Sequence, residues 1–152
     1  MKKRSGANSK SRPPEALTLF IDRSLGNTVV ASALRQQGVA TEIHSDHFPP
    51  DAEDSTWLEE VGRYGWIVLT KDRRIRYRKL ELAAITRAKV RAFILTGGEM
   101  TGEEMARAFV RALPRIRKAV MTSGPPFIAK VSPGGLTEMI WPARPGKSKT
   151  AR

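Results

Sequence analysis

The segment LTLFID, residues 17–22, is the stretch on which the interpretation of the fold depends. Its apolar and β-branched residues predict a buried strand, and that strand ends at the carboxylate of Asp22. The segment WIVLTKD, residues 66–72, repeats the pattern and ends at a second carboxylate, that of Asp72. Two buried strands that each end on an aspartate indicate a sheet that brings acidic side chains to one edge.

Helical and β patterns alternate around these strands. Apolar residues at helical spacing predict a helix from about Leu25 to Leu34, with Ser24 as its N-cap and Gly38 as its stop. A second strand is expected at 39–44, which returns the chain to the sheet.

The middle of the chain is predicted to continue the alternation. We expect a loop at 46–53 and then a helix over 55–64, where Thr56 and Glu59 have the spacing of a capping box. The strand within residues 66–72 follows this helix. After that strand, the chain enters a basic helical segment at 71–88.

A fourth strand is expected at 91–95, followed by a long amphipathic helix. Thr101 and Glu104 form a second capping-box pattern at the start of that helix. Pro114 is expected to kink or interrupt it, because proline lacks the amide hydrogen that a helix interior needs.

Two β-rich segments, 127–131 and 136–141, surround the turn sequence SPGG and predict a C-terminal β-hairpin. The alternation of strands and helices predicts an α/β fold, a three-layer α/β/α sandwich with a mainly parallel central sheet. We expect one domain at 16–141, between basic tails at 1–15 and 142–152 that are too polar to order.

The composition limits the functions that the chain can have. It has 152 residues, a formal net charge of +12 and no cysteine, which excludes disulfides, thiolate metal sites and cysteine nucleophiles. No apolar run approaches the ~20 residues of a membrane-spanning helix, and no signal peptide is evident. We therefore expect a cytoplasmic protein without a membrane partner.

The charge is unevenly distributed within the predicted domain. Residues 42–60 contain seven acids and no lysine or arginine, whereas residues 71–91 contain nine bases and two acids. This pattern fits a cation site beside an anion-binding face. It also fits two solvated surfaces of opposite sign that attract each other, and charge alone favours this second interpretation.

Ligands of open α/β sheets bind outside the carboxyl ends of the strands, where Asp22 and Asp72 are expected. Asp54, at the start of the next predicted helix, is the third candidate, and Asp46 and Asp51 are its rivals on the preceding loop. Each aspartate has a structural alternative, because aspartate also caps helices.

Clustered carboxylates repel one another unless a cation is present, and hard divalent ions such as Mg²⁺ or Mn²⁺ prefer such oxygen ligands. A bound divalent ion can activate water and neutralise a phosphodiester. We therefore treat the aspartates as candidate catalytic and metal-binding residues. Nearby bases would hold a polynucleotide backbone, and the candidates are Arg23, Lys71, Arg73, Arg74, Arg76, Arg78 and Lys79.

The two histidines and three tryptophans are interpreted as structural. His44 and His47 lie three residues apart across a strand-to-loop transition, which is weak spacing for a metal site. Trp57, Trp66 and Trp141 are expected in the core rather than as platforms for nucleic-acid bases.

Several of these motifs together resemble the PIN-like nuclease superfamily. FIDRSLG at 20–26 resembles its first motif, and VLTKDRRI at 68–75 resembles its later motif of strand, threonine, base and aspartate. The stretch at 44–58 and the Gly97-Gly98 pair before a long helix are similar to a subgroup placed with VapC-type toxins.

The resemblance implies a compact α/β/α sandwich and a Mg²⁺- or Mn²⁺-dependent endoribonuclease controlled by an antitoxin. Asp22 and Asp72 match the first acidic ligand and the acid after the third strand, and Asp54 best matches the acid of the middle helix. Thr70 matches the small hydroxyl residue two positions before the late aspartate. The candidate partners are an RNA substrate, an antitoxin protein and a second copy of the chain in a homodimer.

The sequence departs from the superfamily pattern after Asp72. A fourth acid often follows soon, whereas here the next acid is Glu81, and Glu99 is a remote substitute. An alternative to the nuclease is therefore a non-catalytic PIN-like module that binds RNA or protein. Phosphoryl transfer on aspartate is a third class, but the position two residues after Asp22 is Ser24 rather than a second aspartate.

Overall fold

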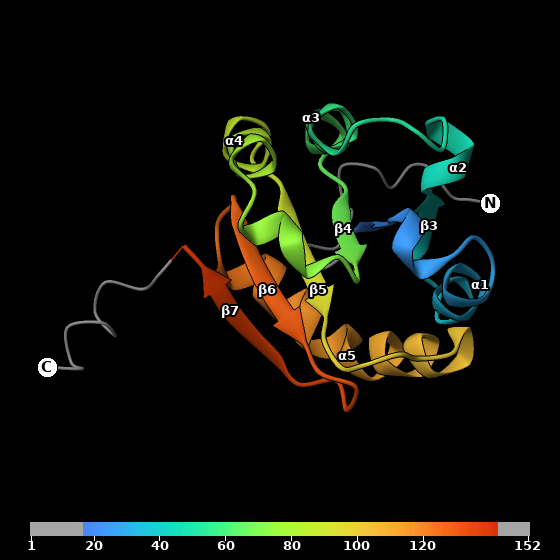
Figure 1. The fold of residues 1–152 in the computed structure, drawn as a ribbon. Coiled ribbons are helices and arrows are strands. Elements are labelled where there is room, and N and C mark those ends of the chain that lie inside the picture. Colours follow the sequence, from blue (N-terminus) through green and yellow to red (C-terminus); the bar gives the residue numbers. More distant parts are fainter. Residues whose placement is uncertain (1–16, 143–152) are drawn as a thin grey trace, which may run out of the picture.

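A six-stranded sheet forms the centre of the computed structural model, which describes residues 17–142 (Figure 1). The strand order is β3-β2-β4-β5-β6-β7, and every neighbouring pair is parallel except β6 with β7. The expected disordered tails lie outside the described residues, apart from Pro142. The strands are β2 (Thr18–Ile21), β3 (Ala40–Ile43), β4 (Ile67–Thr70), β5 (Arg91–Leu95), β6 (Phe127–Val131) and β7 (Thr137–Trp141).

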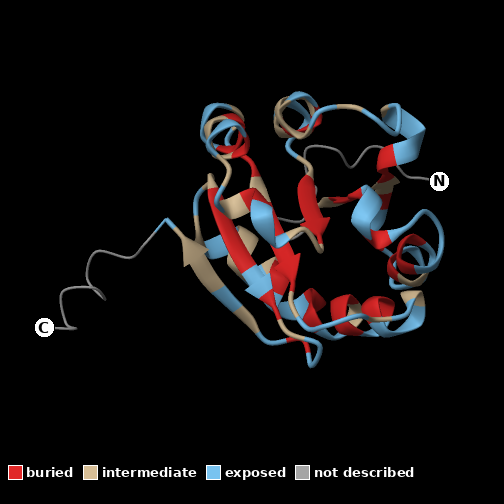
Figure 2. Cartoon of the chain, in the orientation of Figure 1, coloured by how far each residue is buried: buried red, intermediate tan, exposed pale blue. Residues whose placement is uncertain are grey.

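Helices cover both faces of this sheet. On one face lie α1 (Val29–Gln36) and α5 (Gly102–Thr122), and on the other lie α3 (Asp54–Tyr64) and α4 (Lys79–Ala88). Figure 2 shows that the central strands and the inner sides of the helices are buried. The predicted three-layer sandwich is confirmed.

Alternation along the strands separates the core into two parts. Leu19 and Ile21 of β2 pack with α1 and α5, whereas Phe20 between them packs with α3 and α4. Successive side chains of a strand point to opposite faces, so a continuous apolar run is what a doubly covered strand requires.

The first helix begins later than its apolar pattern predicts. A 3₁₀ turn, η2 (Arg23–Leu25), comes first, and α1 starts only at Val29. Gly26 separates the two, because its φ of +82° cannot continue a helix. Ser24 is therefore not the N-cap of α1: Asp22 caps η2, and Thr28 occupies the N-cap position of α1.

The capping box predicted for α3 is also wrong. The helix begins at Asp54, with Glu53 at the N-cap position, so Thr56 and Glu59 lie inside it and form no capping box. The carboxylate of Asp54 in the first turn instead faces the positive end of the helix dipole. The second strand ends at Ile43, one residue earlier than expected, and the short helix α2 (His44–His47) extends into the segment expected as loop, where turn residues follow it.

The predicted basic helix is likewise divided, into the 3₁₀ turn η3 (Arg73–Arg76) and α4.

The capping box of α5 is confirmed: the Thr101 hydroxyl accepts from the Glu104 amide at 3.1 Å, and the Glu104 carboxylate accepts from the Thr101 amide at 2.8 Å. Helix α5 runs through Pro114 without interruption. Its apolar stripe is buried on both sides of the proline, which offsets a penalty of about 3 kcal/mol.

The C-terminal hairpin is confirmed, with β7 antiparallel to β6. Its turn is fastened by Ser132, whose amide donates to the Leu136 carbonyl at 2.9 Å and whose hydroxyl accepts from the Leu136 amide at 3.0 Å. Among the described residues, no helix combines the length and the apolar character needed to cross a bilayer.

Gly62 tests the packing of α3 against α4. A Cβ atom at this position would lie 2.5 Å from the Ala88 Cβ and 2.6 Å from the Ala88 carbonyl oxygen. We expect Gly62→Ala to lower the free energy of unfolding by about 1–3 kcal/mol, although alanine favours a helix. Gly98→Ala is the control, because nothing lies within 4 Å of its added Cβ. Urea denaturation measures both, and equal stabilities would contradict the close helix contact.

Candidate functional site

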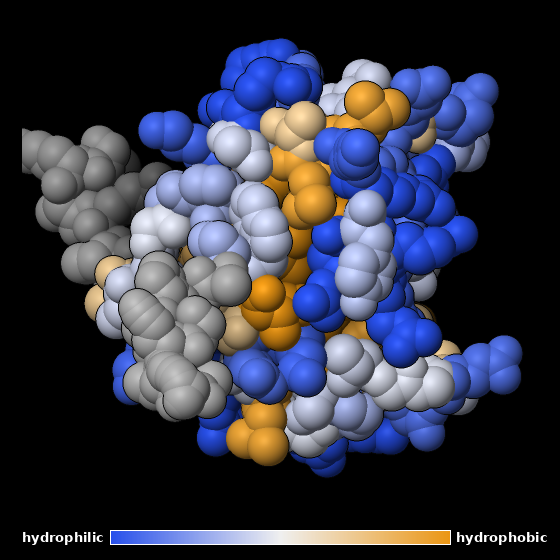
Figure 3. Space-filling view, turned by 60° about the vertical axis from the view of Figure 1, so that its left-hand side comes forward, coloured by the Kyte–Doolittle hydropathy of each residue, from blue (hydrophilic) through white to orange (hydrophobic). Residues whose placement is uncertain are grey.

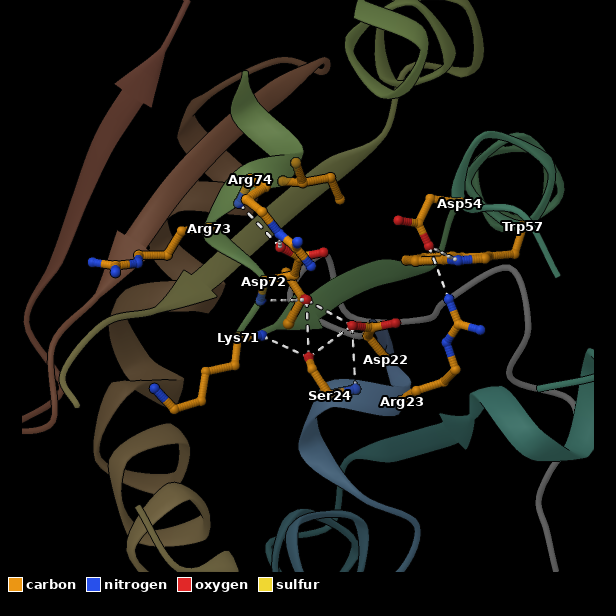
Figure 4. A pocket seen from close by; sticks show the side chains of 11 residues that line it. Asp22, Arg23, Ser24, Asp54, Trp57, Lys71, Asp72, Arg73 and Arg74 are labelled. Carbon is orange, nitrogen blue, oxygen red and sulfur yellow. Dashed lines mark hydrogen bonds and ion pairs between the residues drawn. The ribbon is translucent and has the colours of Figure 1, made fainter. Parts of the chain in front are cut away.

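A cavity of about 560 Å³ opens at the carboxyl ends of β2 and β4 (Figure 4). Because β2 pairs directly with β4, the residues that follow the two strands emerge side by side. The N-terminus of α3 forms the opposite wall. The cavity is lined by Asp22, Arg23, Ser24, Asp54, Trp57, Thr70, Lys71, Asp72, Arg73, Arg74 and Ile75.

Asp22 is held by hydroxyl groups from both strand ends. Its Oδ2 accepts from the Ser24 hydroxyl at 2.7 Å, from the Thr70 hydroxyl at 2.8 Å and from the Ser24 amide at 3.3 Å. The residue is 5% exposed. Its other oxygen, Oδ1, has no hydrogen-bond partner within residues 17–142. The carboxylate is thus fixed through one oxygen, and the second remains available to a ligand.

The two hydroxyls also tie Asp22 to the chain after β4. Ser24 Oγ accepts from the Lys71 amide at 2.9 Å, and Thr70 Oγ1 accepts from the Asp72 amide at 3.0 Å. Each hydroxyl has one hydrogen, which it gives to Asp22, so the 3.2 Å approach between the two hydroxyls is a contact rather than a further bond. Both hydroxyls and both backbone amides of this small network therefore have a partner.

Asp72 begins η3 in the way that Asp22 begins η2. Its Oδ1 accepts from the amide and from the Nε atom of Arg74, at 3.0 and 3.1 Å. Oδ2 has no partner among the described residues. Asp72 therefore acts as a cap, as its structural alternative predicts, while its second oxygen remains without a bond.

Asp54 is neutralised by arginine. Its Oδ1 accepts from Arg23 at 3.1 Å and from the Trp57 indole at 2.9 Å, and its Oδ2 lies 3.5 Å from Arg78. Arg23 also donates to the Pro50 carbonyl. Both oxygens of Asp54 are therefore engaged, unlike those of Asp22 and Asp72.

The three predicted acids share one cavity without forming one ligand group. Within residues 17–142, no three Asp, Glu or His side chains lie close enough together to hold an ion jointly. Figure 4 shows Asp22 and Asp72 near each other and Asp54 farther away, linked to Arg23. Asp22 and Asp72 each have one carboxylate oxygen without a partner among the described residues, whereas Asp54 is paired with arginines.

Four of the seven basic candidates, Arg23, Lys71, Arg73 and Arg74, line this cavity, and they are engaged differently. Lys71 donates to the Gly97 carbonyl at 3.1 Å, and Arg74 pairs with Asp72. Arg73 forms no ion pair among the described residues, and its side chain points away from the aspartates (Figure 4). Arg76 lies outside the cavity lining.

The remaining acidic candidates lie elsewhere. Asp46 and Asp51 are exposed on α2 and on the following turn, and neither lines the cavity. Glu81 is buried in the first turn of α4, with its carboxylate 3.7 Å from Arg78. Glu99 is exposed and also lies outside the lining. No fourth acid therefore completes the set around Asp72 within the described chain.

His44 is buried beneath the site, which agrees with its predicted structural role. Its ring lies 5.4 Å from the Phe48 ring and 5.7 Å from the Trp57 ring, and neither ring nitrogen has a partner. Burial lowers the pKa of His44, and the positive charge of Arg23 lowers it further. The ring is thus held neutral. His47, by contrast, is exposed and lies 2.8 Å from Glu42.

Two residues of the site had other roles in the sequence-based predictions. Ser24, expected as a helix cap, supports Asp22. Trp57 is buried as expected, but its indole also fixes Asp54. A spacing signal exists for the second case, because residues three apart on a helix share a face. For the first, Ser24 lies only two residues after Asp22, which allows a local bond to the carboxylate, whereas its bond to the Lys71 amide joins segments that are distant in sequence.

Comparisons with known proteins agree with this arrangement. Residues 17–97 match the family described as PIN like domain, which covers more than half of the chain, so the chain belongs to that family. The chain is also 27% identical over 126 residues to the putative ribonuclease VapC45 of Mycobacterium tuberculosis, covering 80% of this chain and 91% of that protein. No solved structure matches the chain. The resemblance expected from the strand-end motifs is confirmed.

Thr70→Val tests the hydroxyl network. The substitution keeps the shape of this fully buried side chain but removes the donor to Asp22 and the acceptor for the Asp72 amide. We expect the free energy of unfolding to fall by about 1–3 kcal/mol, because buried polar groups lose their partners. Thr70→Ser retains the hydroxyl and should lose less. If valine were as stable as serine in urea denaturation, the network would have no structural role.

His44 should make stability depend on pH. Its lowered pKa means that, as the pH falls below about 6.5, the unfolded chain binds a proton that the folded chain resists. The free energy of unfolding should therefore decrease as pH falls through this range, until the folded-state pKa is reached. His44→Phe should remove this part of the dependence, whereas His47→Gln should leave it. Urea denaturation above and below this pH measures it, and an unchanged profile for His44→Phe would contradict it.

Proposed function

We propose that this PIN-like protein is a divalent-metal-dependent endoribonuclease and the toxin of a toxin–antitoxin pair. One observation carries the proposal: three aspartates from separate segments, Asp22, Asp54 and Asp72, line one cavity at the carboxyl edge of the sheet. Four bases line the same cavity, so it offers oxygen ligands for a cation beside positive groups for a polyanion.

The donor set is compatible with Mg²⁺ or Mn²⁺. Asp22 and Asp72 each keep one carboxylate oxygen that has no partner among the described residues, and both side chains line the cavity. Such oxygens are preferred ligands of hard divalent ions. When bound, the ion would supply an activated water and neutralise charge on the scissile phosphate. Asp22 and Asp72 are therefore the principal proposed ligands.

The surrounding residues would position these groups. Ser24 and Thr70 would hold Oδ2 of Asp22, so that Oδ1 stays directed at the ligand position. Arg73, which has no acidic partner in the described chain, would contact the RNA backbone together with Lys71 and Arg74. These contacts predict an affinity that falls with rising salt, because each neutralised phosphate releases counterions.

Asp54 would join the site through an exchange of partners. In the free protein, Arg23 and Arg78 neutralise it. A phosphate that attracts Arg23 would release an oxygen of Asp54 toward the cavity, so substrate and cation would enter together. Arg23 would then serve as the counter-ion of an acid before binding and of a phosphate afterwards.

The biological assignment depends on the relatives. The mycobacterial relative is named a putative ribonuclease of the VapC type. By this likeness, the substrate would be cellular RNA in the cytoplasm and the regulator a cognate antitoxin protein. A homodimer is proposed on the same basis.

One observation favours the non-catalytic alternative. Because Asp54 is fully paired and no three acids form a group, the cavity could serve only to bind RNA or protein. A binding module would retain RNA in EDTA and lose nothing when Asp22 is neutralised. The endoribonuclease requires the divalent ion for cleavage.

Asp22→Asn should abolish metal-dependent cleavage while preserving the fold. The asparagine oxygen can still accept from Ser24 and Thr70, whereas its amide group replaces the oxygen offered to the cation. Asp46→Asn removes the same charge at an exposed position away from the cavity and should cleave normally. Cleavage of a labelled RNA in Mn²⁺, with and without EDTA, measures both variants.

Two results would contradict the nuclease. Undiminished cleavage by Asp22→Asn would separate the activity from this cavity. Equal cleavage by the wild type with and without EDTA would remove the metal requirement. Thermal unfolding of Asp22→Asn serves as the check that a lost activity reflects lost chemistry rather than lost structure.

A further inference from the structure

A second cavity, of about 380 Å³, adjoins the candidate site on the other side of η3. The two cavities share Arg73 and Arg74, so η3 forms a wall common to both. The second cavity lies over β5, β6 and β7, which contribute Ile94, Lys130 and Ile140 to its lining, rather than over β2. Its lining consists of Arg73, Arg74, Arg76, Tyr77, Ile94, Thr96, Lys130 and Ile140.

The charge of this lining has one sign. Four of the eight residues are basic and none is acidic. Arg73 and Arg76 form no ion pair among the described residues, whereas Arg74 pairs with Asp72 and Lys130 lies 3.4 Å from the exposed Glu138. The cavity therefore favours a ligand that carries several negative charges.

Tyr77 gives this cavity a flat aromatic surface. Its side chain is 70% exposed, and the Arg76 guanidinium lies 4.9 Å from its ring centroid, covering one face. The ring forms no aromatic contact with other described residues. A large aromatic side chain left exposed among cations is not explained by packing, but it suits a ligand that combines phosphate with a flat ring.

Figure 3 shows hydrophobic and hydrophilic side chains next to each other on the face of the molecule that includes the β7 side of the sheet. A stripe of hydrophobic side chains runs along the middle of this face, with hydrophilic side chains along its right-hand border. Ile94 and Ile140 supply apolar lining to the second cavity next to its bases. An unpaired nucleotide offers matching chemistry, with a charged backbone on one side and a base on the other.

We infer that this second cavity binds unpaired nucleotides next to the scissile phosphate of the RNA, with one base stacked on Tyr77. The inference rests on the proposed ribonuclease function and adds a site for a base and its phosphate beside the position of cleavage. Arg73 and Arg76 hold the backbone near Tyr77, and Lys130 extends the contact toward β7. A double helix cannot use this surface, because its bases are already stacked and paired.

The experiment measures binding separately from cleavage. Asp22→Asn protein in EDTA is titrated with a short fluorescent RNA that has no base pairing, and with the same RNA annealed to its complement. We expect tighter binding of the unpaired strand. Adding Tyr77→Ala should weaken its binding roughly 5- to 150-fold, the range for loss of one base–aromatic stack.

Matched variants separate stacking from other effects. Tyr77→Phe keeps the ring and should bind like the parent. Tyr64→Ala removes another exposed tyrosine, 55% exposed at the end of α3, and should have no effect. Lys130→Gln should reduce the dependence of log affinity on log salt by about 0.7, the value for one phosphate contact with a single strand.

Unchanged affinity of Tyr77→Ala for the unpaired strand would overturn the inference, as would equal affinity for duplex and unpaired RNA. Neither result would affect the proposed nuclease if metal-dependent cleavage by the wild type were still lost in Asp22→Asn. Conversely, stacking on Tyr77 with cleavage that ignores Asp22 would refute the proposed active site and leave the binding surface intact.

Discussion

The direct parallel pairing of β2 with β4 is the constraint on which the site depends. These strands are far apart in sequence, and the pairing continues one residue beyond β2, where the Asp22 amide donates to the Leu69 carbonyl at 3.0 Å. That bond sets Asp22 level with Thr70. The hydroxyls of Ser24 and Thr70 can then reach the same carboxylate oxygen, and the backbone amides after Thr70 can in turn reach those hydroxyls.

Arginines of the chain itself neutralise part of the negative charge that the aspartates bring to the cavity. In the free protein Asp54 is balanced by Arg23 and Arg78, and Asp72 is balanced in part by Arg74, so the cavity does not need an ion in order to fold. Asp22 differs, because it relies on neutral donors alone. Neutral donors stabilise the negative charge without cancelling it, and a carboxylate held in this way keeps its attraction for a divalent ion.

The sequence predicted the parts of this arrangement that depend on local pattern. Continuous apolar runs identified β2 and β4, and the aspartate after each run marked the edge where the cavity opens. It did not predict the division of the first helix, because the apolar residues keep helical spacing across Gly26, and the break appears only in the positive φ of that glycine. It also could not assign partners to Asp54, since the reach of Arg23 and Arg78 depends on where α3 begins and on how the layers are stacked.

The 3₁₀ geometry of η3 explains how one short segment serves two cavities. With three residues per turn, side chains at i and i+3 point the same way. Arg73 and Arg76 therefore share one direction, toward the second cavity, whereas Arg74 is rotated toward Asp72 and Ile75 is buried. An α-helix turns by about 100° per residue, so the two side chains would be about 60° apart on the same face rather than aligned. The sequence favours the tighter turn through the cap at Asp72, whose carboxylate accepts from the Arg74 amide. The same aspartate that offers an oxygen to the first cavity thus fixes the turn that directs arginines into the second.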